Sequence, residues 1–374
     1  MNKTKIKFLL TGIALLTFIQ SSVAQQFNLL SQTQIQYANI YQIIAYKNHL
    51  YIAGSIQYPG NKRYKDGLLA KLTPDLNYVW KNTPGTAFND ELKSFVIFKN
   101  KIYAVGESWE KPKQLRSQVW IVIASPEGKI ISEKFLGDSL EDTGNKIIAD
   151  NNNLLIAGMT RRSIKDLGNI WLIKINPQGD VIWNKIIGSL STGENALNLT
   201  KTSDSYIVIA KLWNWGISNI NPWILKLNKN FNIVWDRKFT GSNDMLLTSC
   251  LLLPNSLLFT GNTWKNKATN KADLWLVKLS YNGQVLFDKT RGTYAPEVTY
   301  GSFHYKNNLF IYGGRGFNPH AAIWQIDTSG QILSQSVFQN LPPIRSATIL
   351  NNKLFIAGGR KQNGFIAILS LPSN

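Results

Sequence analysis

The sequence has little cysteine, little histidine and few acidic side chains. It contains one cysteine, Cys250, and three histidines, with 22 Asp and Glu residues against 41 Lys and Arg, for a formal charge of +19 over 374 residues. A single cysteine excludes an intrachain disulfide, and no Cys/His spacing typical of a metal site is present. Neither Gly-x-Ser-x-Gly nor a phosphate-binding glycine loop occurs, so we expect no cofactor.

Cys250 itself lies in an apolar run, Met245 to Leu253. No histidine neighbours it in sequence, although a nucleophilic thiol needs an activating base. We therefore expect a buried, inert thiol.

Long apolar runs are also lacking, with one exception at the N-terminus. Lys3, Lys5 and Lys7 precede an apolar run from Phe8 to Ile19, and Ser22 and Ala24 follow at the two small positions of a cleavage site. This pattern predicts a signal peptide over residues 1–24 and an exported bacterial protein, periplasmic or extracellular, that begins at Gln25. The run is too short to span a bilayer, and no other stretch approaches that length. Removal of the three lysines would leave a charge of +16, which favours polyanions or anionic surfaces as partners.

A short apolar strand that ends in a small residue recurs along the mature chain. Its first copy is Leu50-Tyr51-Ile52-Ala53-Gly54. The small residues of the copies are Gly54, Gly106, Gly158, Ala210, Gly261, Gly313 and Gly358. They are 52, 52, 52, 51, 52 and 45 residues apart, which indicates an internal repeat.

Further strand signals surround each copy. A second apolar strand follows, with a tryptophan in the same place in most repeats (Trp120, Trp171, Trp223, Trp275) and Leu68 in the first. A turn then leads to a third strand, such as Gly179 to Trp183, and another strand, such as Ser94 to Phe98, precedes the small residue. Four antiparallel strands per repeat make one propeller blade. We predict an all-β, seven-bladed β-propeller that forms a single domain over residues 25–374.

The two ends of the mature chain complement each other. The last repeat stops after its third strand, Phe365 to Leu371, while Phe27-Asn28-Leu29-Leu30-Ser31 precedes the first complete repeat. We therefore expect the N-terminal strand to complete the last blade and close the ring, which removes an open sheet edge.

At this point the chain resembles the secreted bacterial propellers that carry a YIVAG…WLVKLD…G.I.W.K.FGG repeat. The segment from Trp171 to Gly188 carries this resemblance best, and Gly313-Gly314 and Gly358-Gly359 make the last two repeats similar to kelch repeats. The resemblance covers essentially the whole mature chain and implies the propeller fold. Such proteins range from enzymes to scaffolds, so it implies little about function.

Basic residues concentrate in one class of loop. The predicted loops between the second and third strands of the repeats are 55–65, 107–118, 159–169, 211–222, 262–272, 315–321 and 359–363. They hold 16 basic residues against three acids, together with several aromatic residues. The opposite face carries tight hairpins, at Lys99-Asn100, Asn151-Asn152, Asn307-Asn308 and Asn351-Asn352. Function is therefore expected on the face with the long, varied loops.

Two interpretations of these loops are open. The lysines could simply keep an exported protein soluble while the loop tryptophans pack between blades. Alternatively, cations and aromatic faces form a groove for an anionic ligand. The candidate binding residues are Trp109, Arg161, Arg162, Trp213, Trp215, Trp264, Arg315, Phe317 and Arg360. The tryptophans that recur within strands are assigned to core packing.

A carboxylate also recurs just before the innermost strand of the repeat. Its copies are Asp90, Asp142, Glu194, Asp244 and Glu297. These residues could form a cation-binding ring at the channel mouth, or cap the turns between blades by accepting backbone N–H bonds. Capping is the favoured interpretation because every blade needs it.

One group of residues suggests catalysis. His304 lies in an innermost strand, and Arg315 and His320 follow in the same repeat. A base, an acid and a cation on the substrate carboxylate are what β-elimination at a uronic acid requires, and some seven-bladed polysaccharide lyases use that arrangement. No motif fixes the geometry here, so an enzyme is the less favoured interpretation.

The sequence thus favours a non-enzymatic binding or scaffold protein, expected to be a monomer without a transmembrane segment. Its partner would be an anionic polysaccharide, another surface polymer or an acidic protein, and not a specific nucleic acid. A polysaccharide lyase or hydrolase, and an envelope assembly factor, are the alternatives.

Overall fold

The computed structural model describes residues 27–59, 64–109, 116–138, 140–214, 217–241, 243–266 and 271–372. These residues form β-strands and connecting turns, and no helix occurs among them. The described part of the chain therefore also contains no helix that could cross a membrane. The predicted signal peptide lies outside the described residues.

The strands form antiparallel sheets in which strands adjacent in sequence pair with one another. The first such sheet holds β2 (Ala38–Tyr46), β3 (His49–Ile56), β4 (Asp66–Leu72) and β5 (Tyr78–Asn82). An eight-stranded sheet follows, with β6 (Asp90–Phe98), β7 (Lys101–Trp109), β8 (Ser117–Ala124), β9 (Ile130–Leu136), β10 (Glu141–Asp150), β11 (Asn153–Arg161), β12 (Asn169–Ile175) and β13 (Val181–Ile187). A parallel pairing of Glu141 with Ser117 joins its two halves, β6–β9 and β10–β13.

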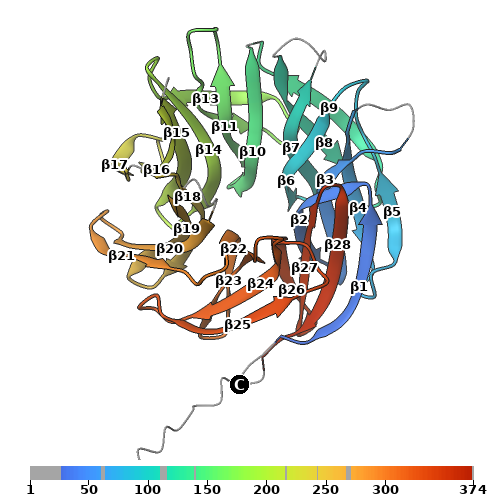
Figure 1. Cartoon of the computed structure of the whole chain (residues 1–374). Helices are drawn as coiled ribbons and strands as arrows, with labels where there is room; N and C mark the ends of the chain where they lie inside the picture. The colour runs from blue at the N-terminus through green and yellow to red at the C-terminus, as the bar shows by residue number, and fades with distance from the viewer. Residues whose placement is uncertain are drawn as a thin grey trace, which may run out of the picture.

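The remaining sheets repeat the same order. One contains β14 (Thr192–Lys201), β15 (Ser205–Asn214), β16 (Ile217–Asn228) and β17 (Ile233–Lys238). The next contains β18 (Met245–Leu253), β19 (Ser256–Asn266), β20 (Lys271–Ser280) and β21 (Val285–Arg291). Then come β22 (Glu297–Tyr305), β23 (Asn308–Arg315), β24 (His320–Ile326) and β25 (Ile332–Phe338), followed by β26 (Ile344–Leu350), β27 (Lys353–Arg360) and β28 (Asn363–Ser370). Figure 1 shows the sheets arranged around a common centre, and the innermost strands are β2, β6, β10, β14, β18, β22 and β26.

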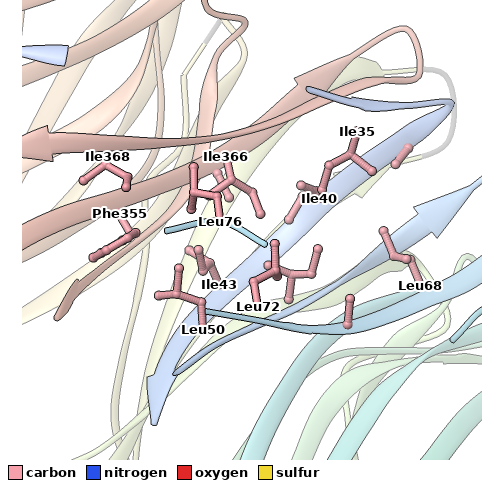
Figure 2. Close-up of a cluster of buried hydrophobic side chains, with 14 of the residues drawn as sticks. Ile35, Ile40, Ile43, Leu50, Leu68, Leu72, Leu76, Phe355, Ile366 and Ile368 are labelled. Carbon is pink, nitrogen blue, oxygen red and sulfur yellow. The ribbon is translucent and has the colours of Figure 1, made fainter. Parts of the chain in front are cut away.

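The N-terminal strand pairs with the C-terminal one, as the sequence predicted. β1 (Leu29–Gln36) lies antiparallel to β28 and completes a four-stranded sheet in the order β1-β28-β27-β26. β1 is longer than the predicted segment. Figure 2 shows the apolar cluster that joins this sheet to the first one, where Ile35 and Phe355 meet Ile43 and Leu72.

Burial differs between the strands of a sheet in the way that stacked sheets require. The middle strands are buried on both faces, as in β3 and β8, because each sheet packs between two neighbours. The outermost strands alternate between exposed and half-buried residues, as in β9. This difference explains why the repeated apolar marks of the sequence fall on the middle strands.

The repeated tryptophans hold the sheets together. Those of the third strands donate their indole N–H to a side-chain oxygen on the fourth strand. Trp120 donates to Glu133 at 3.0 Å and Trp223 to Asp236 at 2.8 Å, while Trp171 donates to the amide of Asn184 at 3.3 Å. Those of the fourth strands cover a turn of the next sheet. Trp80 bonds to Pro126 O at 3.0 Å and lies over Gly128, whose φ of +96° and contact with the ring both exclude a side chain. The prediction that the strand tryptophans belong to the core is confirmed.

The tight hairpins lie where the first and second strands of a sheet meet. Lys99 and Asn100 both have positive φ, as do Asn351 and Asn352, which is the conformation of a type I′ turn. One predicted turn is displaced by a residue. Tyr305 pairs with Asn308, so the turn is Lys306-Asn307 and not Asn307-Asn308.

Candidate functional site

The face opposite these hairpins is formed by the loops that follow the second strand of each sheet and by the connections between sheets. We call it the loop face. The two kinds of connection are bonded to each other: the N–H of Asp90, at the start of β6, donates to Lys65 O in the loop after β3, at 2.8 Å. Residues of the loops after the second strands and residues of the connections between sheets therefore contribute to one surface.

An exposed aromatic pair stands on the loop face near β22 and β23. Phe317 is 65% exposed and Tyr294 is 87% exposed, and their rings meet edge to face at 6.1 Å between centroids. Single exposed apolar side chains are common, but adjacent exposed apolar side chains rimmed by polar residues are typical of binding surfaces.

Cations lie beside this pair. Arg360 donates to Asn318, the residue after Phe317. Arg360, Lys361 and His320 line a pocket of about 270 Å³, and no carboxylate occurs among the described residues that line it. We call Tyr294, Phe317, His320, Arg360 and Lys361 the aromatic-basic sector.

The two arginines of the β11–β12 loop are bound to their own loop. Arg161 Nε donates to Asp166 O at 2.8 Å, and Arg162 Nε lies 3.6 Å from the Asp166 carboxylate. Asp166 is buried and also accepts from Gly168 N and from the Asn169 amide. Arg161 is therefore used to shape the loop, and Arg162, with its side chain 52% exposed, is the more available of the two.

Three of the predicted loop tryptophans are partly buried at strand ends. Trp109 and Trp264 donate their backbone N–H to Asn89 O and Asp244 O in the preceding connections. Trp213 covers Gly193, where a Cβ atom would lie 2.1 Å from the indole, and Lys211 Nζ lies 5.2 Å from its ring centroid. The contacts of the Trp213 ring favour packing over ligand stacking. Trp215 lies outside the described residues.

The predicted catalytic group is not assembled. His304 pairs with Leu309 near the hairpin end of its sheet, whereas His320 pairs with Arg315 at the loop face. Positions 309 and 315 lie on the same strand, β23, about 20 Å apart at ~3.3 Å per residue. Arg315 is further bound to Thr293 Oγ1 at 3.0 Å and lies 3.6 Å from Glu297. The sequence interpretation overlooked that the two histidines lie at opposite ends of one sheet.

Three of the recurring carboxylates bind the connections between sheets. Asp90 accepts from Thr86 N at 2.5 Å, and Asp244 accepts from Ile220 N at 2.8 Å. Glu194 and Glu297 accept from Ser189 N and Thr293 N, both at 3.4 Å. The capping interpretation holds for Asp90, Glu194 and Glu297. Asp244 instead accepts from a backbone N–H within β16, and Asp142 lies against Gly137 in its own connection. The described residues contain no cluster of His, Cys, Asp and Glu suited to a metal ion.

A central cavity is the feature that the sequence interpretation missed. Every innermost strand has a β-bulge at the same place in the repeat. The bulge residues are Tyr41, Lys93, Asn145, Leu197, Thr248, Tyr300 and Arg345, and all of them line a cavity of about 430 Å³. Each bulge residue lies 13 positions before a repeated small residue, so the spacing was visible in the sequence.

Cys250 also lines this cavity. It is a free thiol, and burial raises its pKa far above the usual range. Cys250 is half-buried at the cavity wall, so the prediction of a buried thiol is wrong in that respect; the raised pKa favours the unreactive thiol form.

Comparison with known proteins identifies the fold. No family model matches the sequence, and no curated protein matches it. Similar solved structures include the WD40 β-propeller domain of Doa1, at a TM-score of 0.56 and 10% identity over 93% of this chain and 98% of that one. The β-propeller domain of Cps50 (Swd1) from Myceliophteria thermophila gives 0.58 and 10% identity over 92% and 99%. A catalytically inactive virginiamycin B lyase from Staphylococcus aureus, in complex with quinupristin, gives 0.55 and 10% identity over 91% and 99%. At such low identity these likenesses define the fold alone, and the fold is that of a β-propeller repeat protein.

Proposed function

We propose that this chain is an exported, single-domain β-propeller of seven blades that binds an anionic polysaccharide through its loop face. The blade count takes the halves β6–β9 and β10–β13 of the eight-stranded sheet as two blades, joined only by the Glu141–Ser117 pairing. Export rests on the signal-peptide pattern of residues 1–24. A propeller scaffold suits a coarse binding role because its loops present a broad surface on a rigid core.

The aromatic-basic sector is the observation that carries this proposal. Phe317 and Tyr294 offer open ring faces of the kind that stack on sugar rings, while Arg360 and Lys361 offer charge for carboxylates or sulfates. The contacts of the loop residues also reduce the number of predicted binding residues that are free to contact a ligand. Arg161 already has a partner in its own loop, and Arg315 has partners in Thr293 and Glu297 before and at the start of β22. Neither arginine is therefore expected to contribute most of the binding energy.

Binding is favoured over cleavage. The His304, Arg315 and His320 arrangement needed for a lyase is split between the two ends of one sheet. An acidic protein partner would use the same charges but would not need open aromatic faces for stacking.

The test compares polymers and variants by isothermal titration and by salt elution from immobilised polygalacturonate. Phe317→Ala, and Arg360→Gln together with Lys361→Gln, should each weaken binding roughly tenfold or more, and the charge variant should also reduce the salt dependence. The matched control is Lys229→Gln together with Lys353→Gln, two exposed lysines of the hairpin face, and it should bind as the wild type does.

Equal losses in the sector variant and the control variant would indicate attraction by net charge alone and refute a defined site. Retention of an acidic protein with no binding to any uronate polymer would instead support the protein partner. Unsaturated sugars released from the polymer would show cleavage and refute a pure binding role.

A further inference from the structure

The central cavity has a polar, positively charged lining. Besides the bulge residues it is lined by hydroxyl and amide side chains such as Ser249, Ser302 and Asn198. Its basic residues are Lys93, Lys146 and Arg345, and no Asp or Glu is found among the described residues that line it. A volume of about 430 Å³ falls in the range of small-molecule binding sites.

Two acids near this lining, Glu107 and Glu91, are each paired with a lysine. Lys93 Nζ lies 2.9 Å from Glu107 Oε2, and that pairing, against the opposing effect of burial, lowers the pKa of Glu107. Glu91 is held by Lys65 at 2.6 Å. Lys93 is thus balanced, and Lys146 and Arg345 are left as the excess charge of the cavity.

Arg345 is oriented by aromatic rings and not by an acid. Its guanidinium carbon lies 4.6 Å from the ring centroid of Tyr300 and 5.7 Å from that of Tyr41. Its Nε is buried and has no hydrogen-bond partner in the described part of the chain. A guanidinium held by its faces keeps its planar fork of N–H donors free, and a buried unpaired donor is costly unless a ligand completes it.

Lys146 stands where three other innermost strands have a side-chain acceptor for a backbone N–H of the neighbouring sheet. At the same place in the repeat, Gln42 accepts the N–H of Phe95 at 2.8 Å, Ser94 that of Ile147 at 3.3 Å, and Ser346 that of Ile43 at 3.1 Å. Each of these three bonds joins two neighbouring sets of four strands. A lysine cannot accept such a bond.

The neighbouring strand compensates for this substitution. The N–H of Leu199, which an acceptor at position 146 would have bound, is taken at 2.8 Å by Asn198 Oδ1. Lys146 therefore has no packing role of this kind, and it has neither a hydrogen bond nor an ion pair to any other described residue. Burial of Lys146 disfavours the charged form of its ammonium group and so lowers its pKa.

We propose that the central cavity binds a small organic molecule bearing a carboxylate or a phosphate group, with the Arg345 fork and the Lys146 ammonium as its two cationic contacts. An oxyanion would satisfy the buried Nε of Arg345, and charge-assisted hydrogen bonds are the strongest that either side chain can form. The surrounding hydroxyl and amide groups would bind the polar remainder of the molecule. This site is separate from the aromatic-basic sector and does not depend on polysaccharide binding there.

The test is isothermal titration of the full chain with glucuronate and with glucose 6-phosphate, which separate the two oxyanions on one sugar, and with glucose as the neutral comparison. Binding of at least one of the two anions, and at least tenfold weaker binding of glucose, is expected. Arg345→Gln and Lys146→Gln should each reduce anion affinity tenfold or more. Lys353→Gln, which removes an exposed charge of the hairpin face, should leave it unchanged.

Folding of the variants is checked by their melting temperatures without ligand. Lys146→Gln places at this position the residue type that Gln42 has in the first sheet, so it is expected to fold. Arg345→Lys keeps the charge and loses the fork, and it should bind more weakly than the wild type. Absence of anion binding at millimolar concentration, equal binding of glucose, or unchanged affinity in Lys146→Gln would overturn the proposal. Polygalacturonate binding that persists in Arg345→Gln would show that the loop-face proposal stands independently.

Discussion

A Cβ atom on Gly106 would lie 1.7 Å from the backbone carbonyl oxygen of Glu91. The same approach occurs between Gly54 and Asn39 O at 2.0 Å, and between Gly158 and Thr143 O at 1.8 Å. In each case the carbonyl belongs to the residue two positions before the bulge of the innermost strand. The repeated small residue is therefore required by the bulge that directs a side chain into the central cavity.

Replacement of Gly106 by alanine should destabilise the protein by about 1–3 kcal/mol, because the added methyl group displaces the backbone of β6. The free energy of unfolding from urea titration measures this effect. Ala210 has the corresponding place in β15, so Ala210→Gly serves as the control and should cost no more than about 1 kcal/mol. If Gly106→Ala unfolds at the urea concentration of the wild type, the close approach to Glu91 is wrong.

The fold was largely predictable because each kind of strand occurs in every repeat, so the sequence contains several copies of the same strand signal. A single apolar run such as Leu154 to Gly158 could be a strand or part of a buried helix, but recurrence every 52 residues with turn signals between the copies excludes most alternatives. The tryptophan positions were predictable for the same reason. Packing that recurs in each sheet leaves a periodic trace in the sequence.

The site was less predictable because it depends on what departs from the repeat. Arg161 looks as available as Arg360 in the sequence, yet a backbone carbonyl of its own loop, Asp166 O, binds it. Loop conformations of this kind have no periodic signal. The separation of His304 from His320, in contrast, follows from strand direction and could have been derived from the sequence.

The carboxylate of Asp90 caps the connection that precedes β6. Asp90→Ala should lower the free energy of unfolding by about 1–3 kcal/mol, since Thr86 N would lose its buried acceptor. Asp90→Asn keeps an acceptor oxygen and should cost less. Calcium or EDTA should leave the melting temperature of the wild type unchanged, whereas a calcium-dependent shift lost in Asp90→Asn would favour the cation-ring interpretation.

The two Asp90 variants also carry a pH signature. Burial raises the pKa of Asp90, against the opposing effect of its hydrogen bonds to Ser108 and Thr86. The proton is thus bound more tightly in the folded state, so the stability linked to this group is present below the unfolded pKa and is lost as pH rises through the folded pKa. Asn resembles the protonated acid, so the stability of Asp90→Asn should shift in its favour, relative to the wild type, as the pH rises above the unfolded pKa of about 4. A difference that stays constant over this range would contradict the raised pKa.

Asp150 should show the opposite pH dependence. Burial alone would raise its pKa, but hydrogen bonds from Lys201 at 2.7 Å and Tyr206 at 2.7 Å, together with Lys174 at 2.9 Å, outweigh burial and lower it. A lowered folded pKa contributes stability that is present above the unfolded pKa and is lost as pH falls through the folded value.

Asp150→Asn should therefore destabilise the protein by about 1–3 kcal/mol at pH 7, because both lysines lose a buried partner. The difference from the wild type should shrink as the pH falls below about 4. Urea titrations at pH 7 and pH 3 measure it. Asp180→Asn, which breaks the exposed pair with Lys134, is the control and should have little effect at either pH.

The pairing of β1 with β28 makes the N-terminal segment essential to the last sheet. Removal of residues 1–37 would expose the backbone edge of β28, from Asn363 to Ser370, and would take Ile35 from the cluster in Figure 2 and Phe27 from its contact with Phe310. An exposed edge pairs with other chains, so this variant should form oligomers, and its melting temperature should fall by roughly 5–10 °C.

Removal of residues 1–26 alone should change neither property. A synthetic peptide of residues 27–37 should restore the melting temperature and the monomer, because it can supply the missing strand without a covalent link. A monomer of full stability that lacks residues 1–37 would mean that β1 is dispensable and that the last sheet is stable with three strands.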